Sequence, residues 1–184
     1  MVYKSCLLGA VSLWVLLMLG CAVPQSGEGS ASGVSGSAAP TFRDLTFGQA
    51  PTSDMMLVLN SDMPCYTRLN DDMTVGSGRL SGLEYCFYNQ QLMAVFIRTV
   101  GMENSLSLLE ALQAKYGTGT QSNPYLPNYM WGAELPLLSH SPLLISYERN
   151  TATGNAQAIL QSKAIAAEEN AARTNAASSA ASNF

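Results

Sequence analysis

Three kinds of side chain in this sequence could carry chemistry: one histidine, four cysteines and a few neighbouring acidic residues. His140 is the only histidine, and it lies between Ser139 and Ser141, which suggests a hydrolase because serine hydrolases need a histidine base. Neighbouring side chains in a turn point apart, however, and the folded region has no G-x-S-x-G motif to present a nucleophile. We therefore expect an exposed turn at His140 and no catalytic residue, and keep a hydrolase that uses His140 as an alternative.

Cys21 lies where a run of large aliphatic residues gives way to small and polar ones. One charge, Lys4, precedes the uncharged residues 6–19, and Gly20 and Ala22 flank the cysteine. This is the pattern of a secretory signal peptide, so we expect residues 1–20 to be removed. Two other interpretations stay open: an uncleaved anchor, because the uncharged run 6–23 is close to the lower length limit of a membrane span, and an ordinary small residue near a cleavage site.

The stretch LLMLGCAVPQSG also resembles the lipobox of bacterial lipoproteins, although Met18 stands where that family most often has leucine. The resemblance implies that Cys21 receives fatty acyl chains such as palmitate and becomes the first residue of the mature protein. Two or more chains hold a protein stably, so a membrane is the expected partner. In that family an aspartate after the cysteine favours the inner membrane. Ala22 therefore implies a cell-envelope location at the periplasmic leaflet of the outer membrane.

Two further cysteines, Cys65 and Cys86, lie in segments that resemble neighbouring strands. An exported compartment is oxidising, so an even pair of cysteines there predicts a disulfide. The alternative is two separate buried thiols that pack as small hydrophobic residues. The sequence has no C-x-x-C pair and a single histidine, so we expect no metal site.

The glycine-rich residues 76–82 and the pair Asp71-Asp72 are the remaining candidates for ligand chemistry. The glycines have the spacing G-x-G-x-x-x-G, one residue too long for a dinucleotide motif, and they lead into a strand rather than a helix. The aspartates lack the rest of an EF-hand pattern. We expect a hairpin turn and a solvated turn at these two places, and no cofactor.

A binding surface is best sought in the aromatic residues 125–131. Tyr125, Tyr129 and Trp131 are candidate partner-binding residues, because Tyr and Trp are enriched where proteins dock. The same aromatic residues could instead close the core. A small-molecule binder would require a cavity beside the main helix, lined by Tyr85, Phe96 or Trp131.

Composition sets the remaining bounds. Without the signal the chain has eight basic and thirteen acidic side chains, so it has no basic surface with which to bind nucleic acid. Residues 21–40 form a flexible linker, since thirteen of the nineteen residues after Cys21 are Gly, Ser or Ala. Residues 164–184 form an Ala-, Ser- and Asn-rich tail, with a short helix in its first part and a disordered end.

The intervening residues 41–163 have the size of one domain, for which we expect a two-layer α+β fold. Apolar patterns predict strands at 57–59, 65–69, 83–88, 92–97, 129–131, 135–138 and 143–147, with an edge strand at 157–161. Residues 83–97 form a hairpin whose second strand is central. One main helix covers 105–116, capped by Asn104 or Ser105 and ended by Gly117, and residues 51–54 start a short helical turn.

The segments TFRDLTFG, YCFYNQQL and KYG look similar to small exported bacterial domains of uncharacterised function, which implies an envelope domain and no particular activity. Together these observations predict a lipid-anchored, non-catalytic binding or scaffold module with a possible envelope protein partner. A periplasmic small-molecule binder and a hydrolase that uses His140 are the alternatives.

Overall fold

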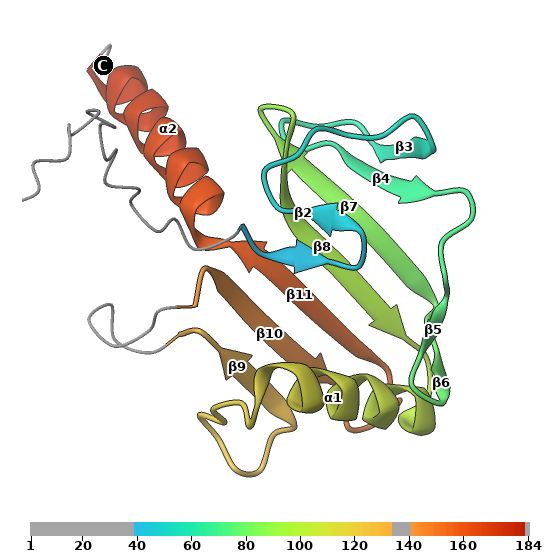
Figure 1. The fold of residues 1–184 in the computed structure, drawn as a ribbon. Helices are drawn as coiled ribbons and strands as arrows, with labels where there is room; N and C mark the ends of the chain where they lie inside the picture. Colours follow the sequence, from blue (N-terminus) through green and yellow to red (C-terminus); the bar gives the residue numbers. More distant parts are fainter. Residues whose placement is uncertain (1–38, 134–140, 183–184) are drawn as a thin grey trace, which may run out of the picture. The chain divides into compact units, whose positions relative to one another are not determined.

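The computed structural model describes residues 39–133 and 141–182. The chain divides into two units, Met1–Gly36 and Ser37–Phe184, and everything below concerns the second. The described part of this unit contains an antiparallel seven-stranded sheet, two small two-stranded sheets and two helices (Figure 1). The predicted α+β class is therefore confirmed.

The large sheet has the strand order β3-β4-β7-β8-β11-β10-β9. Its strands are β3 (Met55–Leu59), β4 (Cys65–Arg68), β7 (Gly82–Tyr88), β8 (Gln91–Thr99), β9 (Asn128–Trp131), β10 (Leu143–Arg149) and β11 (Ala156–Ser162). The strand predicted at 157–161 is present as β11, but it is not an edge strand, because it lies between β8 and β10. The strand predicted at 135–138 falls outside the described residues.

The central hairpin β7–β8 follows its sequence pattern closely. Leu83, Tyr85 and Phe87 are buried on one face, and β8 is buried on both faces for most of its length. Asn89 and Gln90 connect the strands with φ values of 47° and 64°. Two successive left-handed residues match the right-handed twist of the strands, which is why a two-residue turn suffices here.

Helix α1 (Met102–Tyr116) packs on one face of the sheet (Figure 1). It begins three residues earlier than the sequence predicted, so Asn104 and Ser105 lie inside the helix instead of capping it. Gly117, with a φ of 81°, follows the last helical residue as expected. The side chain of Asn104 accepts a hydrogen bond from the backbone N–H of Arg79 at 2.9 Å, so it binds a neighbouring hairpin.

The first turn of α1 is fixed to the sheet by buried polar groups. Ser105 Oγ donates to the carbonyl of Gly154 at 2.6 Å and lies 2.8 Å from Thr99 Oγ1. The Tyr147 hydroxyl donates to the carbonyl of Ser105 at 2.8 Å, and burial raises the pKa of this phenol. Because buried polar groups cost free energy unless paired, these contacts define one seating of the helix.

Two small hairpins cover the same face of the sheet as α1. They are β1 (Thr41–Phe42) with β2 (Leu45–Thr46), and β5 (Thr74–Val75) with β6 (Gly78–Arg79). The hairpin turn predicted in the glycine-rich residues 76–82 is thereby confirmed, at the start of that segment. Residues 51–54 form a turn before β3 and no helix, so that expectation was wrong. Leu45, Phe47 and Leu80 from these segments join the apolar side chains of α1 and the sheet in one core.

A second, smaller apolar cluster lies on the opposite face of the sheet. It contains the disulfide between Cys65 of β4 and Cys86 of β7, with Ala94, Met63, Phe96 and Ile159 around it. The two cysteines are direct partners in the strand register, and their Cα atoms are 4.0 Å apart. The predicted disulfide is therefore present.

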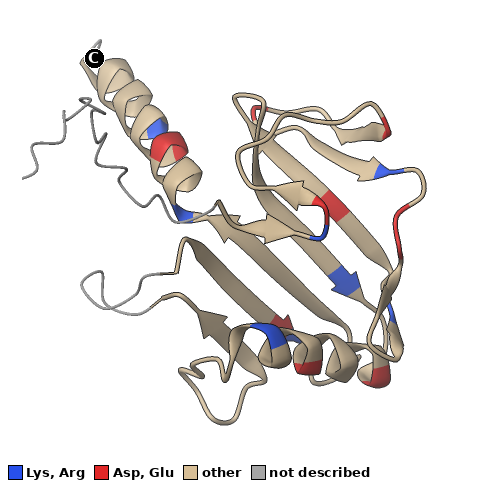
Figure 2. Cartoon of the chain, in the orientation of Figure 1, with Lys and Arg blue, Asp and Glu red and all other residues tan. Residues whose placement is uncertain are grey.

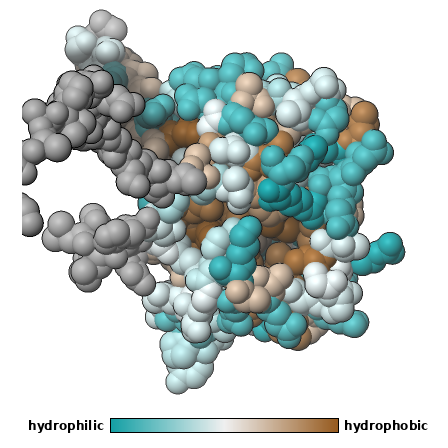
Figure 3. All heavy atoms as spheres, viewed as in Figure 1, coloured by the Kyte–Doolittle hydropathy of each residue, from teal (hydrophilic) through white to brown (hydrophobic). Residues whose placement is uncertain are grey.

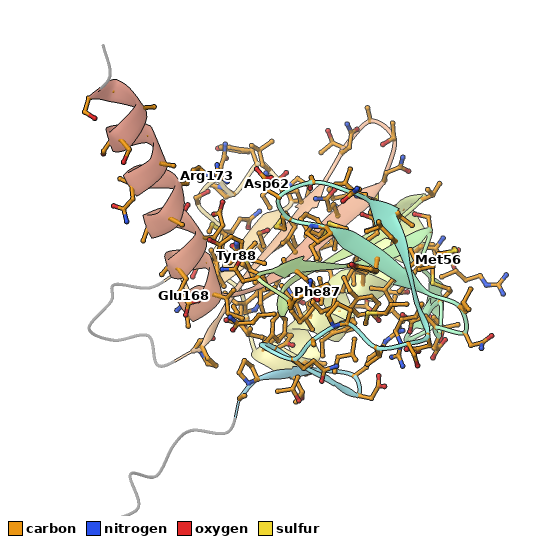
Figure 4. All side chains as sticks on the ribbon, turned by 90° about the horizontal axis from the view of Figure 1, so that it is seen from above. Met56, Asp62, Phe87, Tyr88, Glu168 and Arg173 are labelled. Carbon is orange, nitrogen blue, oxygen red and sulfur yellow. A yellow bond between two sulfur atoms is a disulfide. The ribbon has the colours of Figure 1, made fainter. Side chains whose placement is uncertain are left out.

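The second helix, α2 (Lys163–Ala181), continues directly from β11 (Figure 1). Ser162 caps it by accepting the N–H of Ile165 at 3.5 Å, and Ile165 is its only buried residue. The helix extends well beyond the short first part that the sequence analysis expected, because Ala is the best helix former and dominates this segment. A groove of about 540 Å³ lies between α2 and the segments that contain Asp62 and Tyr88, with Arg173 on its helical side (Figure 4).

Candidate ligand-binding site

A partly buried ion pair holds one wall of the candidate site. Asp71 has a side chain that is 7% exposed, and it accepts hydrogen bonds from the Arg43 guanidinium and from the hydroxyl of Tyr85. Tyr85 is completely buried, and this burial, followed by its hydrogen bond to Asp71, raises the pKa of its phenol. The expectation of a solvated Asp71-Asp72 turn was thus wrong for Asp71. Asp72 does cap a turn by accepting the backbone N–H of Thr74 at 2.9 Å.

A second set of charges fixes the β1–β2 turn to the sheet. Arg68 on β4 donates to both carboxylate oxygens of Asp44 at 2.7 and 3.0 Å, and to Asp54 at 2.8 Å. The hydrogen bond from Arg68 is the main reason why the pKa of Asp44 is lowered. The pKa of Asp54 is lowered by the Thr52 hydroxyl first and by Arg68 second. Such a bidentate pair constrains the turn geometrically as well as electrostatically.

The two small hairpins, α1 and the sheet together enclose a cavity of about 190 Å³. Figure 3 shows hydrophobic residues exposed in the hollow between α1 and the β1–β2 hairpin. The lining comes from all of these elements: Phe42, Arg43, Thr74, Val75, Leu80, Ile97, Leu108, Ala111, Leu112, Lys115, Tyr116 and Leu160.

The helical wall of this cavity follows from the periodicity of α1. Leu108, Ala111, Leu112 and Lys115 recur at intervals of three and four residues, so they share one face of the helix. On its other side the β5–β6 hairpin approaches the helix closely, since a Cβ atom at Gly78 would lie 2.8 Å from that of Ser107. Glycine therefore lets the hairpin pack against α1 and complete the wall.

The polar groups of the lining favour an anionic or hydrogen-bond-accepting ligand. Arg43 and Lys115 are its two charged residues, and no acidic residue belongs to the described lining. The hydroxyl of Tyr116 is buried and has no hydrogen-bond partner among the described residues. Leaving such a group unpaired costs about 1–3 kcal/mol, so an acceptor that reached this hydroxyl after a small movement of the ring would recover that energy. The arrangement can bind and orient a ligand with an apolar part and an acceptor group.

For the alternative of a small-molecule binder, the sequence analysis required a cavity beside the helix but named other lining residues. Tyr85 belongs to the core next to the Asp71 pair, and Phe96 belongs to the cluster on the opposite face. Trp131 is 7% exposed and donates from Nε1 to the carbonyl of Gly117 at 2.7 Å, which joins β9 to the end of α1. None of the three lines the cavity, so the lining predicted for a small-molecule binder was wrong.

The aromatic candidates for partner binding occupy different environments. Tyr129 packs against Trp131 with ring centroids 6.2 Å apart, and both rings contact the core. Tyr125 is 89% exposed in the loop before β9. The structure therefore does not bring Tyr125, Tyr129 and Trp131 together as one surface.

Several predicted residues lie outside the part of the chain that the structure describes. Cys21 and His140 both belong to this group, as do the signal and most of the linker. Within the described residues, no three His, Cys, Asp or Glu side chains are placed to hold a metal ion. The two helices described are too short or too polar to cross a membrane.

The sequence analysis missed the four residues that give the cavity its polar character and its outer wall: Phe42, Arg43, Lys115 and Tyr116. Lys115-Tyr116-Gly117 was interpreted as the end of a helix and as part of a resemblance to exported domains, without a role in a binding site. Arg43 was noted as part of the TFRDLTFG segment without a role. Its φ of 56° is an unusual backbone conformation for a residue other than glycine, and it becomes visible only in the structure.

Comparison with known proteins gives no relative from which a role could be transferred: no family model matches the sequence, and no curated protein or solved structure shows a significant match.

Proposed function

We propose that the chain is an exported, lipid-anchored envelope protein whose folded domain is a non-catalytic binding module. Its ligand would be a small molecule with an apolar group and a carboxylate, bound in the cavity beside α1. The observation that carries this proposal is a cavity with apolar walls whose described lining includes Arg43, Lys115 and Tyr116 and no acidic residue, with Arg43 itself paired to Asp71 behind the wall. Among the functions expected from the sequence, this cavity favours the small-molecule binder.

The size and charge of the cavity define the ligand class. An apolar protein cavity of about 150 Å³ accommodates benzene, so a volume of about 190 Å³ suits a phenyl-sized group. A carboxylate on that group would approach Arg43 and Lys115, and Tyr116 could donate to it. Charge-assisted hydrogen bonds of this kind are about twice as strong as neutral ones. An aromatic monocarboxylate is therefore the simplest probe.

The proposed location rests on the N-terminal sequence. Lipidation of Cys21 would place the domain at the periplasmic leaflet of the outer membrane, with residues 22–40 as its tether. The Cys65–Cys86 disulfide supports export, because disulfides persist in oxidising compartments. Mass spectrometry of the mature amino terminus tests this part, and an unmodified Cys21 would contradict it.

Thermal unfolding of the full mature protein tests the binding proposal. The probes are phenylacetate, phenethylamine and phenethyl alcohol, which share a phenyl group and differ in their polar end. Ligand at about 100 times its Kd stabilises a protein by about 2.7 kcal/mol, or roughly 5–10 °C in Tm for a domain of this size. We expect the carboxylate to give the largest increase and the amine the smallest.

Two variants localise any binding to the cavity. Ala111→Phe should fill the cavity and abolish the Tm increase by phenylacetate, whereas Leu106→Phe, on an exposed position of α1, should not change it. Tyr116→Phe should weaken phenylacetate binding by about tenfold, the equivalent of one hydrogen bond to a charged group. Equal binding by wild type and Ala111→Phe would refute the cavity as the site.

A further inference from the structure

The two edges of the large sheet differ in how their backbone groups are satisfied. Along β9, Met130 exchanges two hydrogen bonds with Thr120, at 2.7 and 2.9 Å, so a loop covers that edge. At the other edge β3 is the last strand, and within the described ranges no strand pairs with its outer side. An unpaired edge is a ready template for another strand.

The open edge is also apolar on both of its faces. Met56, Leu57, Val58 and Leu59 are successive residues with exposed fractions of 54, 45, 49 and 52%. Strand β3 contains no charged residue and no proline, the usual protections of such an edge (Figure 2). Met56 lies at the side of the domain away from α2 (Figure 4). A run of exposed aliphatic residues on an unpaired strand indicates an interaction surface.

The backbone of Leu57 points toward this open side. The carbonyl of Asp54 accepts the N–H of Leu69 at 3.3 Å, so Asp54 faces β4. Along an antiparallel strand, the backbone N–H and C=O groups of successive residues point alternately toward the neighbouring strand and away from it. The backbone groups of Met56 therefore point toward β4, and those of Leu57 point toward the open side. The Met55 N–H, which also faces outward, already donates to the carbonyl of Thr52 at 3.1 Å. Leu57 is therefore the natural centre for pairing.

We propose that β3 pairs antiparallel with β3 of a second copy of this chain, about a two-fold axis at Leu57. The two Leu57 residues would then exchange reciprocal N–H to C=O bonds and make one continuous sheet from two domains. The sequence of β3 is compatible with its own reverse: Met56 would meet Val58, and Asp54 would meet Asn60 instead of another acid. Like charges directly opposite each other destabilise paired strands, and this register has none.

The strand is held in place before it binds. Asp54 at its start is bonded to Arg68, and β4 is joined to β7 by the disulfide. A pre-organised surface loses less entropy on association. The register shift between Leu57 and Leu59 limits the regular pairing to a few residues. The interface is thus smaller than the standard range of about 1,200–2,000 Å², and we expect a micromolar Kd.

Sedimentation velocity of the full mature chain in detergent tests the proposal over a micromolar concentration range. Wild type should form dimers. Leu57→Lys and Leu57→Glu should each raise the Kd by at least about tenfold, because each places two like charges together at the axis. An equimolar mixture of the two variants should restore dimers, since opposite charges then meet. Val100→Lys, at an exposed position that is not on β3, should leave the Kd unchanged.

The mixture of Leu57→Lys and Leu57→Glu distinguishes pairing of β3 with itself from a general loss of hydrophobic surface, since both explanations predict weaker dimers for each variant alone. Recovery of dimers requires that position 57 of one copy faces position 57 of the other. Wild type that stays monomeric throughout the range would overturn the proposal, as would dimers that persist in Leu57→Lys or a mixture that stays monomeric. Circular dichroism on each variant ensures that only folded protein is compared.

Discussion

The disulfide is expected to stabilise the outer hairpin β3–β4 more than the rest of the sheet. Strand β4 shares only two register pairs with β7, Cys65 with Cys86 and Tyr66 with Tyr85, whereas β7 and β8 share seven. The bond spans 21 residues, for which the loss of chain entropy in the unfolded state corresponds to about 3 kcal/mol. At about 2–4 °C per kcal/mol, its removal should lower the Tm by roughly 6–12 °C.

The assay compares three samples of the full mature protein: oxidised wild type, wild type reduced in denaturant and refolded under reductant, and Cys65→Ala/Cys86→Ala. The reduced and double-alanine samples both lack the bond, so the difference between them measures the packing of the buried sulfur atoms alone. Hydrogen exchange should show increased opening of residues 55–68 before any change in α1. A Tm decrease below about 2 °C, or exchange that increases first in β10 or α1, would refute this reasoning.

Three further outcomes follow from individual contacts in the structure. Gly154→Ala should lower the free energy of unfolding by about 2 kcal/mol more than Gly76→Ala. Both glycines have positive φ, but only at Gly154 would a Cβ atom lie 2.7 Å from a backbone atom, the nitrogen of Met102 at the start of α1. Equal urea midpoints for the two variants would contradict this. Tyr85→Phe should cost about 1.5–3 kcal/mol of stability, because it removes a hydrogen bond to a buried carboxylate. The pKa of this phenol is raised in the folded protein, so above about pH 10 the unfolded state loses the phenol proton first and wild type becomes less stable. Tyr85→Phe should show less of this loss of stability at high pH. Arg68→Met should weaken the acid dependence of urea unfolding. The pKa of Asp44 is lowered in the folded state, so the stability that Asp44 contributes is present above its ordinary pKa of 3.8 and is lost as the pH falls below that value. An unchanged stability profile between about pH 5 and 2 would show that the Arg68–Asp44 pair does not cause this dependence.

Local pattern was enough to predict the parts of the fold that depend on neighbouring residues. The hairpin of residues 82–99 was visible because alternating and continuous apolar runs flank a polar turn. The main helix was visible from its leucine spacing, and the disulfide from two unpaired cysteines on adjacent strands. Each of these features is decided within about twenty residues of sequence, with little competition from distant segments.

The errors come from contacts between distant segments. Strand β11 looked like an edge strand because polar residues recur along it, yet it is inserted between β8 and β10, which no local pattern records. Asp71 looked like a turn residue until Arg43, far away in sequence, was placed beside it. The helix start shifted because Ser105 is used to bind Gly154 and Tyr147 rather than to cap. The cavity depends on all of these placements at once.

Helix α2 is anchored through a single buried side chain, Ile165 in its first turn. Isolated helices of this length are marginal in water, so the later turns of α2 must open and close at little cost in free energy. Proteases should therefore trim the carboxyl end without unfolding the sheet. For the same reason, a reporter protein joined after Ala181 should leave the domain intact, which makes this end the natural place for a fusion tag.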